Sequence, residues 1–369
     1  MYSFKSLRVA LLVAVVMGAT AHAQILIGQT AGFTGAVAAG VKETTDGAKL
    51  YIDSVNAKGG INGQKIELIS MDDKFDPKLA AENARVLIEE KNVVALFLNR
   101  GTPHTEAIIP WLDKHGVPLI VPSTGAMYLH QPVRKHVFNV RATYQREAEK
   151  AITHLVTISM IKIALVYSDD SFGADGVAGA QKGLTAASLT PAALEKFDRA
   201  KPDFSIIGPQ IAKSGAQAVM IIAAGTAVVD CLKAVRAAGS SAQIVTLSNN
   251  ASGGFIKSLG ENGHGVIVSQ VFPNSLNYAL VKEASDMARA QGILEVSPAM
   301  LEGFTSAKVL VEALRRVSGK PTREKIQAVL DTFGKFDLGG LEIHYSLKDH
   351  TGLDFSDLSI ISSAGKFRR

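Results

Sequence analysis

Residues 25–77 constrain the fold more than any other stretch of the chain. They contain an apolar run of strand length (25–27), a loop of small residues (31–40), a helical pattern, and a second apolar run (66–71). Small residues let backbone approach a ligand closely, and the N–H groups at a helix start favour a polar or anionic group. This stretch predicts one βαβ unit that carries a binding loop.

The alternation of strand and helix continues beyond this unit and then starts again. A helix over 77–91 precedes strand 93–98, and a further helix leads to strand 118–121. A second set begins with the apolar strand 162–167. It continues with helices and strands at 173–187, 193–197, 204–213, 217–223, 227–238, 243–247 and 265–271. Such alternation predicts a parallel sheet with helices on both faces, and two successive sets predict two lobes.

The N-terminus has the layout of a cleavable secretory signal. Residues 1–23 carry Lys5 and Arg8, then an apolar stretch over 9–17, and end in the sequence A-H-A. The apolar stretch is too short to anchor the chain in a bilayer. The residue directly after the cleavage site is Gln24 and not a cysteine that could accept a lipid. We therefore expect a chain that begins at Gln24 and is free in an envelope compartment.

Composition supports a globular protein and gives no sign of nucleic-acid binding. The 369 residues are 47% hydrophobic and 20% charged, as is usual for α/β domains. Without Lys5 and Arg8, 37 basic residues face 34 acidic ones, a bias too small to indicate nucleic acid. Cys231 is the only cysteine, which excludes an internal disulfide, and its apolar helical surroundings predict a buried residue.

Catalytic motifs are missing from the sequence. It contains no G-x-S-x-G, P-loop, H-E-x-x-H or zinc-type cysteine spacing. An S-x-x-K match at Ser159 and Lys162 lacks its companion motifs. We therefore predict no enzyme, no cofactor and no metal site.

Four features of the opening unit resemble the periplasmic leucine/isoleucine/valine-binding protein family, the type I solute receptors of ABC importers. They are the pair Thr34–Gly35, the turn N-A-K-G-G-I-N-G at 56–63, the pair Asp72–Asp73, and Asp76–Pro77. Together they are far more specific than a single glycine motif. We treat the resemblance as covering the whole chain after the signal.

The resemblance implies an α/β fold of two doubly wound parallel-sheet lobes joined by a multi-strand hinge, the type I periplasmic binding protein fold. The first lobe would comprise 24–142 and 273–338, and the second 143–272 and 339–369. The ligand would lie between the carboxyl ends of the strands and be trapped when the lobes close.

Arg100 and Thr102 lie in the segment N-R-G-T-P-H-T, which follows strand 93–98 and opens a helix. The pattern predicts Thr102 as the N-cap and Pro103 at the first helical position. The family resemblance implies that Thr102 and the free helix amides hold a ligand carboxylate. Arg100 departs from the hydroxyl-rich segment usual in amino-acid binders. It would either add a bidentate carboxylate contact or point to solvent.

Ser123 and Thr124 form a hydroxyl-bearing loop at the end of strand 118–121. If this strand neighbours strand 93–98, the loop lies level with Thr102. The resemblance then places Ser123 and Thr124 against the ligand's carboxylate; the alternative is an ordinary turn.

The second lobe supplies a further set of candidates. Asp169 and Asp170 open a helix without a nearby His or Glu cluster, so helix capping accounts for them better than catalysis or metal binding. The resemblance implies that Phe172 closes over the ligand, with core packing as the alternative. Tyr144 should lie at the first crossover between the lobes and line the cleft.

Two departures from the family pattern bear on the ligand. Where amino-acid-binding relatives have an acid that pairs with the ligand's ammonium, this chain has Ser248 and Asn249. Leaving an ammonium buried without a negative partner is costly. Gly40 replaces a tyrosine of the family's first loop. Lys42 or Glu43 could substitute for the missing contacts, or each could lie on a solvated helix turn.

The resemblance therefore predicts the periplasmic solute-binding component of an ABC importer, which captures a small carboxylate-bearing ligand by lobe closure. The ligand would be an amino acid or a related organic or aromatic acid. The partners would be this ligand and the ABC permease subunits, with no nucleic acid, and the protein would be a monomer. The alternative is a periplasmic receptor that reports the ligand to a membrane signalling partner.

Overall fold

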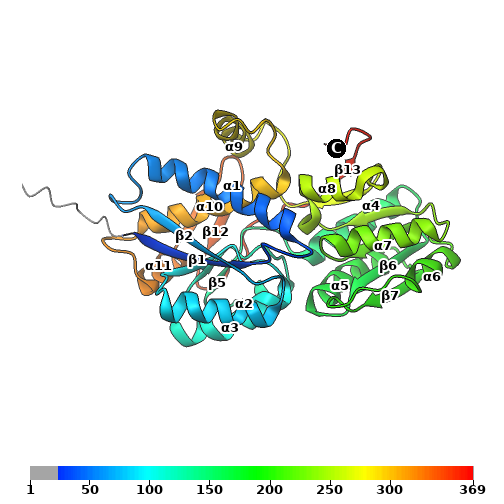
Figure 1. Cartoon of the computed structure of the whole chain (residues 1–369), viewed down its shortest axis with the longest axis horizontal. Helices are drawn as coiled ribbons and strands as arrows, with labels where there is room; N and C mark the ends of the chain where they lie inside the picture. Colours follow the sequence, from blue (N-terminus) through cyan, green and yellow to red (C-terminus); the bar gives the residue numbers. More distant parts are fainter. Residues whose placement is uncertain (1–23, 369) are drawn as a thin grey trace, which may run out of the picture.

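The computed structural model of the chain describes residues 24–368 as two α/β bodies side by side (Figure 1). The predicted signal, residues 1–23, lies outside the described residues. Within them, no helix combines the length and the apolar character needed to cross a membrane.

The first body is built on a five-stranded parallel sheet. Its strands, in order across the sheet, are β2 (Ile66–Asp72), β1 (Ile25–Ala31), β3 (Ala95–Phe97), β4 (Leu119–Ile120) and β5 (Val137–Phe138). On one face lie α1 (Ala38–Ala57), α9 (Ala279–Ala290), α10 (Pro298–Arg316) and α11 (Arg323–Asp331), with the hairpin β11 (Gly334–Asp337) and β12 (Glu342–Tyr345). On the other face lie α2 (Pro77–Arg85), its π-helical continuation η1 (Val86–Glu90), α3 (Thr102–His115) and the short turn η2 (Met127–Leu129).

The second body is built on a seven-stranded sheet. Its order is β14 (Phe367–Arg368), β13 (Asp357–Ile361), β10 (Ile267–Gln270), β9 (Gln243–Thr246), β8 (Ala218–Ile222), β6 (Ile163–Ser168) and β7 (Ala193–Phe197). Only the pairs that include β13 are antiparallel. One face is covered by α4 (Tyr144–Thr157) and α5 (Ser171–Ala186). The other is covered by α6 (Ile207–Lys213), α7 (Thr226–Ala237) and α8 (Gly253–Leu259), near the turns η3 (Ser248–Asn250) and η4 (Gly260–Gly263).

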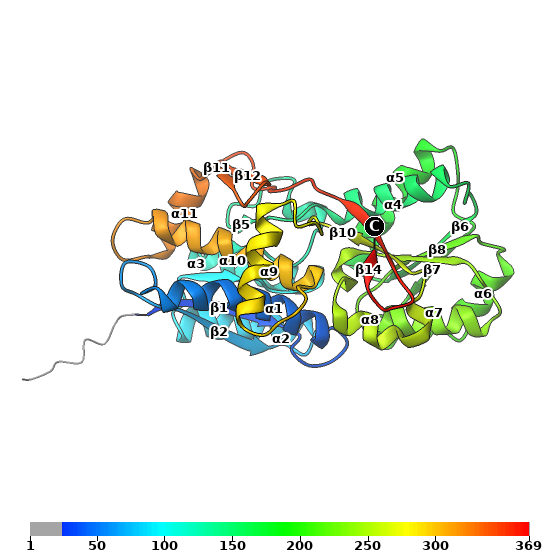
Figure 2. The same ribbon diagram turned by 90° about the horizontal axis from the view of Figure 1, so that it is seen from above.

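Small residues bring α1 and α10 into close contact. A Cβ atom added at Gly47 would lie 1.9 Å from the carbonyl oxygen of Met300, and one at Gly303 would lie 1.7 Å from that of Thr44. Both distances are below any tolerable separation, so glycine is required at both positions. This packing fixes the direction of α1, whose first turns reach the boundary between the two bodies (Figure 2).

The chain passes between the two sheets after β5, after β10 and after β12 (Figure 2). Tyr345 and Leu353 pack into the core of the first body, and β13 pairs with β10 in the second. The predicted limits of the two lobes stay a prediction; these contacts favour a last crossing between Leu353 and Asp357. The sequence patterns did not predict helix α4, strand β5 or the β11–β12 hairpin.

Cys231 is buried in α7 as a small apolar residue, as its surroundings predicted. Burial raises the pKa of its thiol to about 12. The thiolate, which is the reactive form, is therefore absent at neutral pH.

Candidate functional site

Three cavities meet where the carboxyl ends of the strands of the two bodies face each other, and Arg100 lines all three. The largest holds about 640 Å³ of empty space and lies between the start of α1 and the second body. A second, of about 230 Å³, has aromatic walls, and a third, of about 160 Å³, lies behind Arg100 in the first body. Arg100 is thus the common wall of the cleft.

Arg100 follows β3 and pairs with Ser123, which follows β4. Its side chain is buried, and its guanidinium donates to the hydroxyl of Ser123 at 3.3 Å and, across the cleft, to the carbonyl oxygen of Asn249. Arg100 forms no ion pair with any carboxylate among residues 24–368. Burial lowers its pKa and the nearby charge of Glu302 opposes this, but an arginine keeps its charge in proteins.

The N-terminus of α3 carries no side-chain cap. Sequence analysis predicted Thr102 as the N-cap, but the N-cap is Gly101, and Thr102 is already helical. The reason is the left-handed backbone of Gly101, whose φ of 100° only glycine adopts readily. The hydroxyl of Thr102 instead meets that of Thr124 at 2.7 Å, which confirms that the two loops lie level. One hydroxyl donates to the other, so one of the two protons stays free for another acceptor.

Ser123 has already committed its only proton. Its hydroxyl donates to Glu302 at 2.8 Å and accepts from Arg100. It lines the cavity behind Arg100 and is buried. Ser123 can therefore act on a carboxylate by orienting Arg100, whereas a direct bond to a ligand would require its proton to turn away from Glu302.

Aromatic side chains from both bodies line the 230 Å³ cavity: Phe75, Tyr144 and Phe172. The rings of Tyr144 and Phe172 meet edge to face, with centroids 4.9 Å apart. Burial raises the pKa of Tyr144, so its phenol keeps its proton, and no residue among 24–368 accepts that proton. The phenol proton of Tyr144, a residue that lines the cavity, is therefore left without an acceptor in the described part of the chain.

The second body closes this cavity with Arg199. Its guanidinium lies 5.1 Å from the ring of Phe75 in the first body and 5.7 Å from that of Phe172. Its Nε donates to Asp170 at 2.5 Å, and Asp170 caps α5 by accepting from the amides of Phe172 and Gly173. Capping by Asp170 was predicted from the sequence. The charge of Arg199, unlike that of Arg100, is matched by a carboxylate.

Asn249 and Ser248 have different surroundings although they are adjacent. Asn249 lines two of the three cavities, and its side-chain amide donates to the carbonyl of Ala223 at 3.1 Å. Ser248 lines none of them. Its hydroxyl accepts a hydrogen bond from Arg141, and its backbone amide donates to Glu147 at 2.9 Å.

Glu43 joins the two bodies instead of facing a cavity. Its carboxylate accepts from the amides of Gly253 and Gly254 at the start of α8, at 3.0 and 2.7 Å, and from the hydroxyl of Ser297 at 2.6 Å. Lys42 is exposed and pairs with Asp46. Of the two alternatives left open by the sequence, the solvated turn describes Lys42, and Glu43 is engaged elsewhere.

A backbone hydrogen bond also crosses the cleft. The amide of Thr226 in the second body donates to the carbonyl oxygen of Ala36 in the first at 3.2 Å. A Cβ atom at Gly225 would lie 1.8 Å from the same oxygen, so only glycine permits this approach. The two bodies are thus in contact along the start of α1.

Comparison with known proteins identifies the family. A family model described as periplasmic binding protein matches residues 24–354. This chain belongs to the periplasmic binding protein family. The match confirms the predicted family, and the two α/β sheets with helices on both faces are the predicted fold class.

Three relatives of this periplasmic binding protein share less than 30% sequence identity with it. An amino acid binding protein of Pseudomonas aeruginosa is 28% identical over 214 residues, so the alignment spans only 57% of each chain. A Leu/Ile/Val-binding protein homolog 7 of Brucella abortus is 24% identical over 344 residues, covering 87% of this chain and 85% of the relative. A substrate-binding periplasmic protein of Ralstonia solanacearum has a crystal structure that matches with a TM-score of 0.85 at 29% identity, covering 93% of this chain and 99% of that one. All three are described as binding proteins, in agreement with the prediction of a binding protein rather than an enzyme.

A buried ionic network that sequence analysis missed lies behind the cleft of this binding protein. Arg141, in the first crossing between the sheets, pairs with Glu147 at 2.7 Å and with Glu302 at 3.3 Å, and all three side chains are buried. Glu147 also accepts from Ser269 at 2.5 Å. The signal for Glu302 was an acid at the start of the strongly apolar stretch of α10. Arg141 and Glu147 gave no comparable signal.

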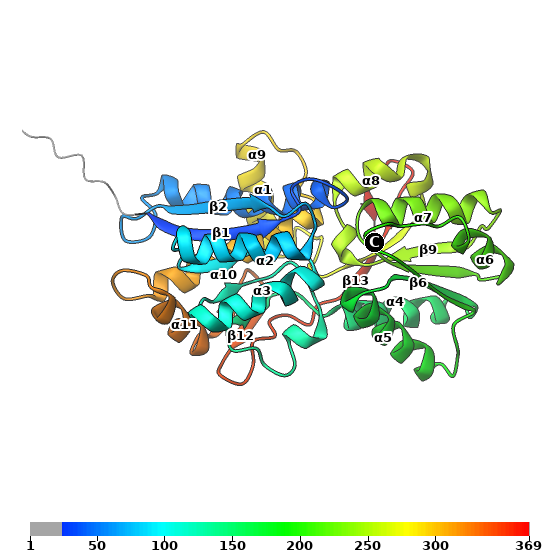
Figure 3. The same cartoon turned by 60° about the horizontal axis from the view of Figure 1, so that its bottom comes forward.

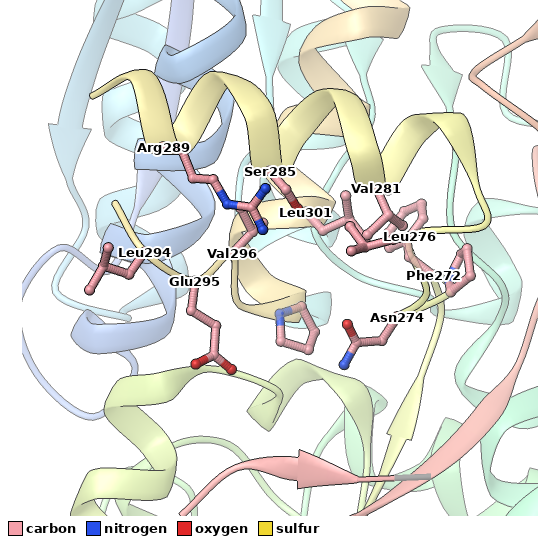
Figure 4. Close-up of a pocket in the computed structure, with 12 residues that line it drawn as sticks. Phe272, Asn274, Leu276, Val281, Ser285, Arg289, Leu294, Glu295, Val296 and Leu301 are labelled. Carbon is pink, nitrogen blue, oxygen red and sulfur yellow. The ribbon is translucent and has the colours of Figure 1, made fainter. Parts of the chain in front are cut away.

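A fourth hollow of about 730 Å³ lies outside the cleft of the binding protein, between α9 and the segments before and after it (Figure 4). Its walls carry Arg289 and Glu295, together with the exposed side chains of Leu276 and Leu294. None of the predicted site residues lines it. Seven of them instead lie on or next to the cavities around Arg100: Arg100, Thr102, Ser123, Thr124, Tyr144, Phe172 and Asn249.

Proposed function

We propose that the protein is the periplasmic solute-binding component of an ABC importer and captures a small carboxylate-bearing ligand by closure of its two lobes. The observation that carries this proposal is the charge of Arg100. A buried guanidinium without a carboxylate partner is costly, because desolvation is not repaid by an ion pair. A ligand carboxylate at the cavities that Arg100 lines would provide that partner.

The surroundings of Arg100 suit a carboxylate. The uncapped start of α3 contributes free amide groups and the positive end of the helix dipole. The hydroxyls of Thr102 and Thr124 have one free proton between them, and Tyr144 has another. Micromolar affinity corresponds to about 8 kcal/mol. A few charge-assisted hydrogen bonds of about 1.5–3 kcal/mol each, with apolar burial, can supply this after the cost of closure.

Closure is supported by contacts that a single lobe cannot make. Arg100 reaches Asn249, Arg199 lies over Phe75, and Glu43 binds the start of α8, in each case across the cleft. A ligand that sits between these residues would contact both lobes only when they are closed. Its binding energy would then favour the closed state over the open one.

The proposed carboxylate specificity is tested by calorimetry on the purified protein. Acetate, hexanoate, benzoate, pyruvate and leucine are titrated, each beside its uncharged amide as the matched control. We expect at least one acid to bind and its amide to bind at least a hundredfold more weakly, because the amide cannot pair with Arg100. Equal affinity for an acid and its amide, or no binding by any acid, would overturn the proposal.

The transport role is tested in cells after a ligand is found. Deletion of the gene should abolish high-affinity uptake of the labelled ligand, and the Arg100→Met variant should not restore it. If uptake persists and only a transcriptional response to the ligand is lost, the protein acts as a sensor and not in an importer.

A further inference from the structure

We infer that the ligand has an apolar body and no ammonium group, and that Gly40 sets how large that body can be. This inference rests on the proposed function, since it starts from a carboxylate held at Arg100. It concerns the largest of the three cavities that meet at Arg100.

The empty space determines where the ligand's body lies. The aromatic cavity and the cavity behind Arg100 hold about 230 and 160 Å³, against about 640 Å³ on the side of α1. A carboxylate paired with Arg100 therefore finds room for the rest of the molecule on the α1 side. The first-body wall there consists of the small residues 35–40.

The polar side chains in the opposite wall are largely satisfied within the protein. Asn250 donates to Ala223 and Thr246 and accepts from the amide of Gly225. The hydroxyl of Ser252 accepts from the amide of Phe255 as the cap of α8. Groups that are already paired offer little to a polar ligand body, whereas apolar surface can be buried against the ring of Phe255 and the small residues opposite.

An ammonium group would find no negative partner in these cavities. None of the three is lined by an aspartate or glutamate of the described residues, while two arginines, Arg100 and Arg199, line the aromatic cavity. The acid nearest in sequence, Glu43, is held by two amides and a hydroxyl. A buried ammonium would lose its hydration and face like charges.

Gly40 is the wall residue beside the guanidinium. A Cβ atom added to it would lie 3.6 Å from a terminal nitrogen of Arg100 and 3.8 Å from the hydroxyl of Ser252. A side chain at this position would therefore extend into the large cavity. Longer side chains would occupy the space assigned to the ligand's body.

The fold itself does not require glycine at this position. Gly40 lies in α1 with ordinary helical backbone, and an added Cβ would make only ordinary contacts. Gly47, two turns further along α1, has no such freedom, since its Cβ would collide with the backbone of Met300 at 1.9 Å. Glycine is a weak helix former compared with alanine or leucine. Gly40 weakens the helix and is not needed for packing. Its presence therefore indicates that the space beside it in the largest cavity is kept open for the ligand's body.

The inference is tested by calorimetry on four forms of the protein: wild type, Gly40→Ala, Gly40→Leu and the control Lys49→Leu. Lys49 is an exposed residue of α1, so the control adds the same leucine to the same helix away from the cavity. The probes are acetate, hexanoate, benzoate, 4-methylpentanoate and leucine, which is 4-methylpentanoate with an added ammonium group. Melting temperatures without ligand are measured in parallel.

We expect wild type to bind 4-methylpentanoate at least tenfold more tightly than leucine. Gly40→Leu should weaken hexanoate and benzoate at least tenfold but acetate less than threefold, and Gly40→Ala should fall between. The Gly40 variants should melt at or above the wild-type temperature, and Lys49→Leu should bind like wild type.

Three results would overturn the inference while leaving the proposed function in place. The first is leucine binding as tightly as 4-methylpentanoate. The second is Gly40→Leu binding every acid with wild-type affinity, and the third is Gly40→Leu binding all the acids more weakly by the same factor. Absence of binding by every acid in wild type is a different result, because it overturns the proposed function itself. If Gly40→Leu does not fold, the same comparison is made with Gly40→Ala, for which a threefold selective loss is expected.

Discussion

Helices α3 and α5 begin on opposite sides of the boundary between the two bodies (Figure 3), and their first amide groups have different partners. The first amides of α5 are bound by Asp170, whose charge is matched by Arg199. The start of α3 has no side-chain cap and lies beside Arg100, which has no acid of its own among residues 24–368. In the second body Asp170 thus serves both the helix start and Arg199, whereas in the first body Arg100 lacks a carboxylate partner, which we propose the ligand supplies.

The largest effect is expected from removing the unmatched charge of Arg100. Arg100→Met keeps a similar volume and should weaken binding of any carboxylate ligand at least a hundredfold, or about 3 kcal/mol. Without ligand the variant should be at least as stable as wild type, because a costly buried cation is removed. Calorimetry and thermal melting measure both effects. Arg146→Met, an exposed arginine of α4, is the control. Unchanged carboxylate affinity in Arg100→Met would contradict the contrast between the starts of α3 and α5, because Arg100 would then not pair with the ligand.

The next effect concerns His104, in the first turn of α3. It is stacked on Phe75, its ring nitrogens have no hydrogen-bond partner among the described residues, and burial lowers its pKa to about 4. Since the folded pKa lies below the unfolded value near 6.5, protonation favours the unfolded state. The contribution of His104 to the free energy of unfolding should therefore fall as pH drops from about 6.5 to 4, by about 2–3 kcal/mol.

Two aspartates act in the opposite direction over the same range. Burial raises the pKa of Asp73 and of Asp175 to about 6, so both stabilise the fold as pH falls below 6. The contribution of His104 is therefore read from the difference between wild type and His104→Leu in urea melts at pH 7 and pH 4.5. The variant should gain on wild type at the lower pH. A constant difference at both values would assign His104 no role in acid sensitivity.

A smaller effect is expected at the start of α5. Asp170→Ala removes the helix cap and leaves Arg199 without its acid, which should lower the free energy of unfolding by about 1–2 kcal/mol. Ligand affinity should change less than fivefold, because Asp170 binds the amides of α5 and Arg199 and lines none of the three cavities. Asp169→Ala, an exposed neighbour, is the control in the same urea melts. Loss of binding with unchanged stability would contradict the contrast between the two helices.

The smallest effect is expected from a single hydroxyl. Thr102→Val removes one member of the Thr102–Thr124 pair and should weaken carboxylate binding by about 1 kcal/mol, or about fivefold. In Thr124→Val the same loss should appear, and the double variant should lose little more, because the pair has one free proton. Additive losses would show that each hydroxyl binds the ligand separately.

The fold could be predicted from the sequence because the spacing of apolar residues along the chain indicates where strands and helices lie. Apolar runs separated by helical patterns predicted both sets of strands and helices, and the capping by Asp170 followed from its place before a helix. The two-residue strand β5 was missed because it is too short to carry a complete pattern. Thr102 was misplaced as the N-cap because the left-handed backbone of Gly101 is not visible in residue types.

The site could be predicted in part, and the limit has a physical cause. Thr102, Ser123 and Thr124 were assigned to the ligand by the family resemblance, and they lie together because loops that follow neighbouring strands meet at one sheet edge. The pairing of Arg141 with Glu302 joins residues 161 positions apart and depends on how α10 returns to the first body. No local pattern records such a contact. The role of Ser123 as a support for Arg100 likewise depends on Glu302 and could not be foreseen.

The backbone bond from Thr226 to Ala36 offers a direct reading of motion between the two bodies. Because it joins main-chain atoms, its strength does not depend on any side chain that a ligand or a substitution would change. The amide proton of Thr226 should exchange with deuterated solvent only when the bodies separate. Its exchange rate therefore reports the fraction of time the molecule spends open, with or without a ligand and in each of the variants above.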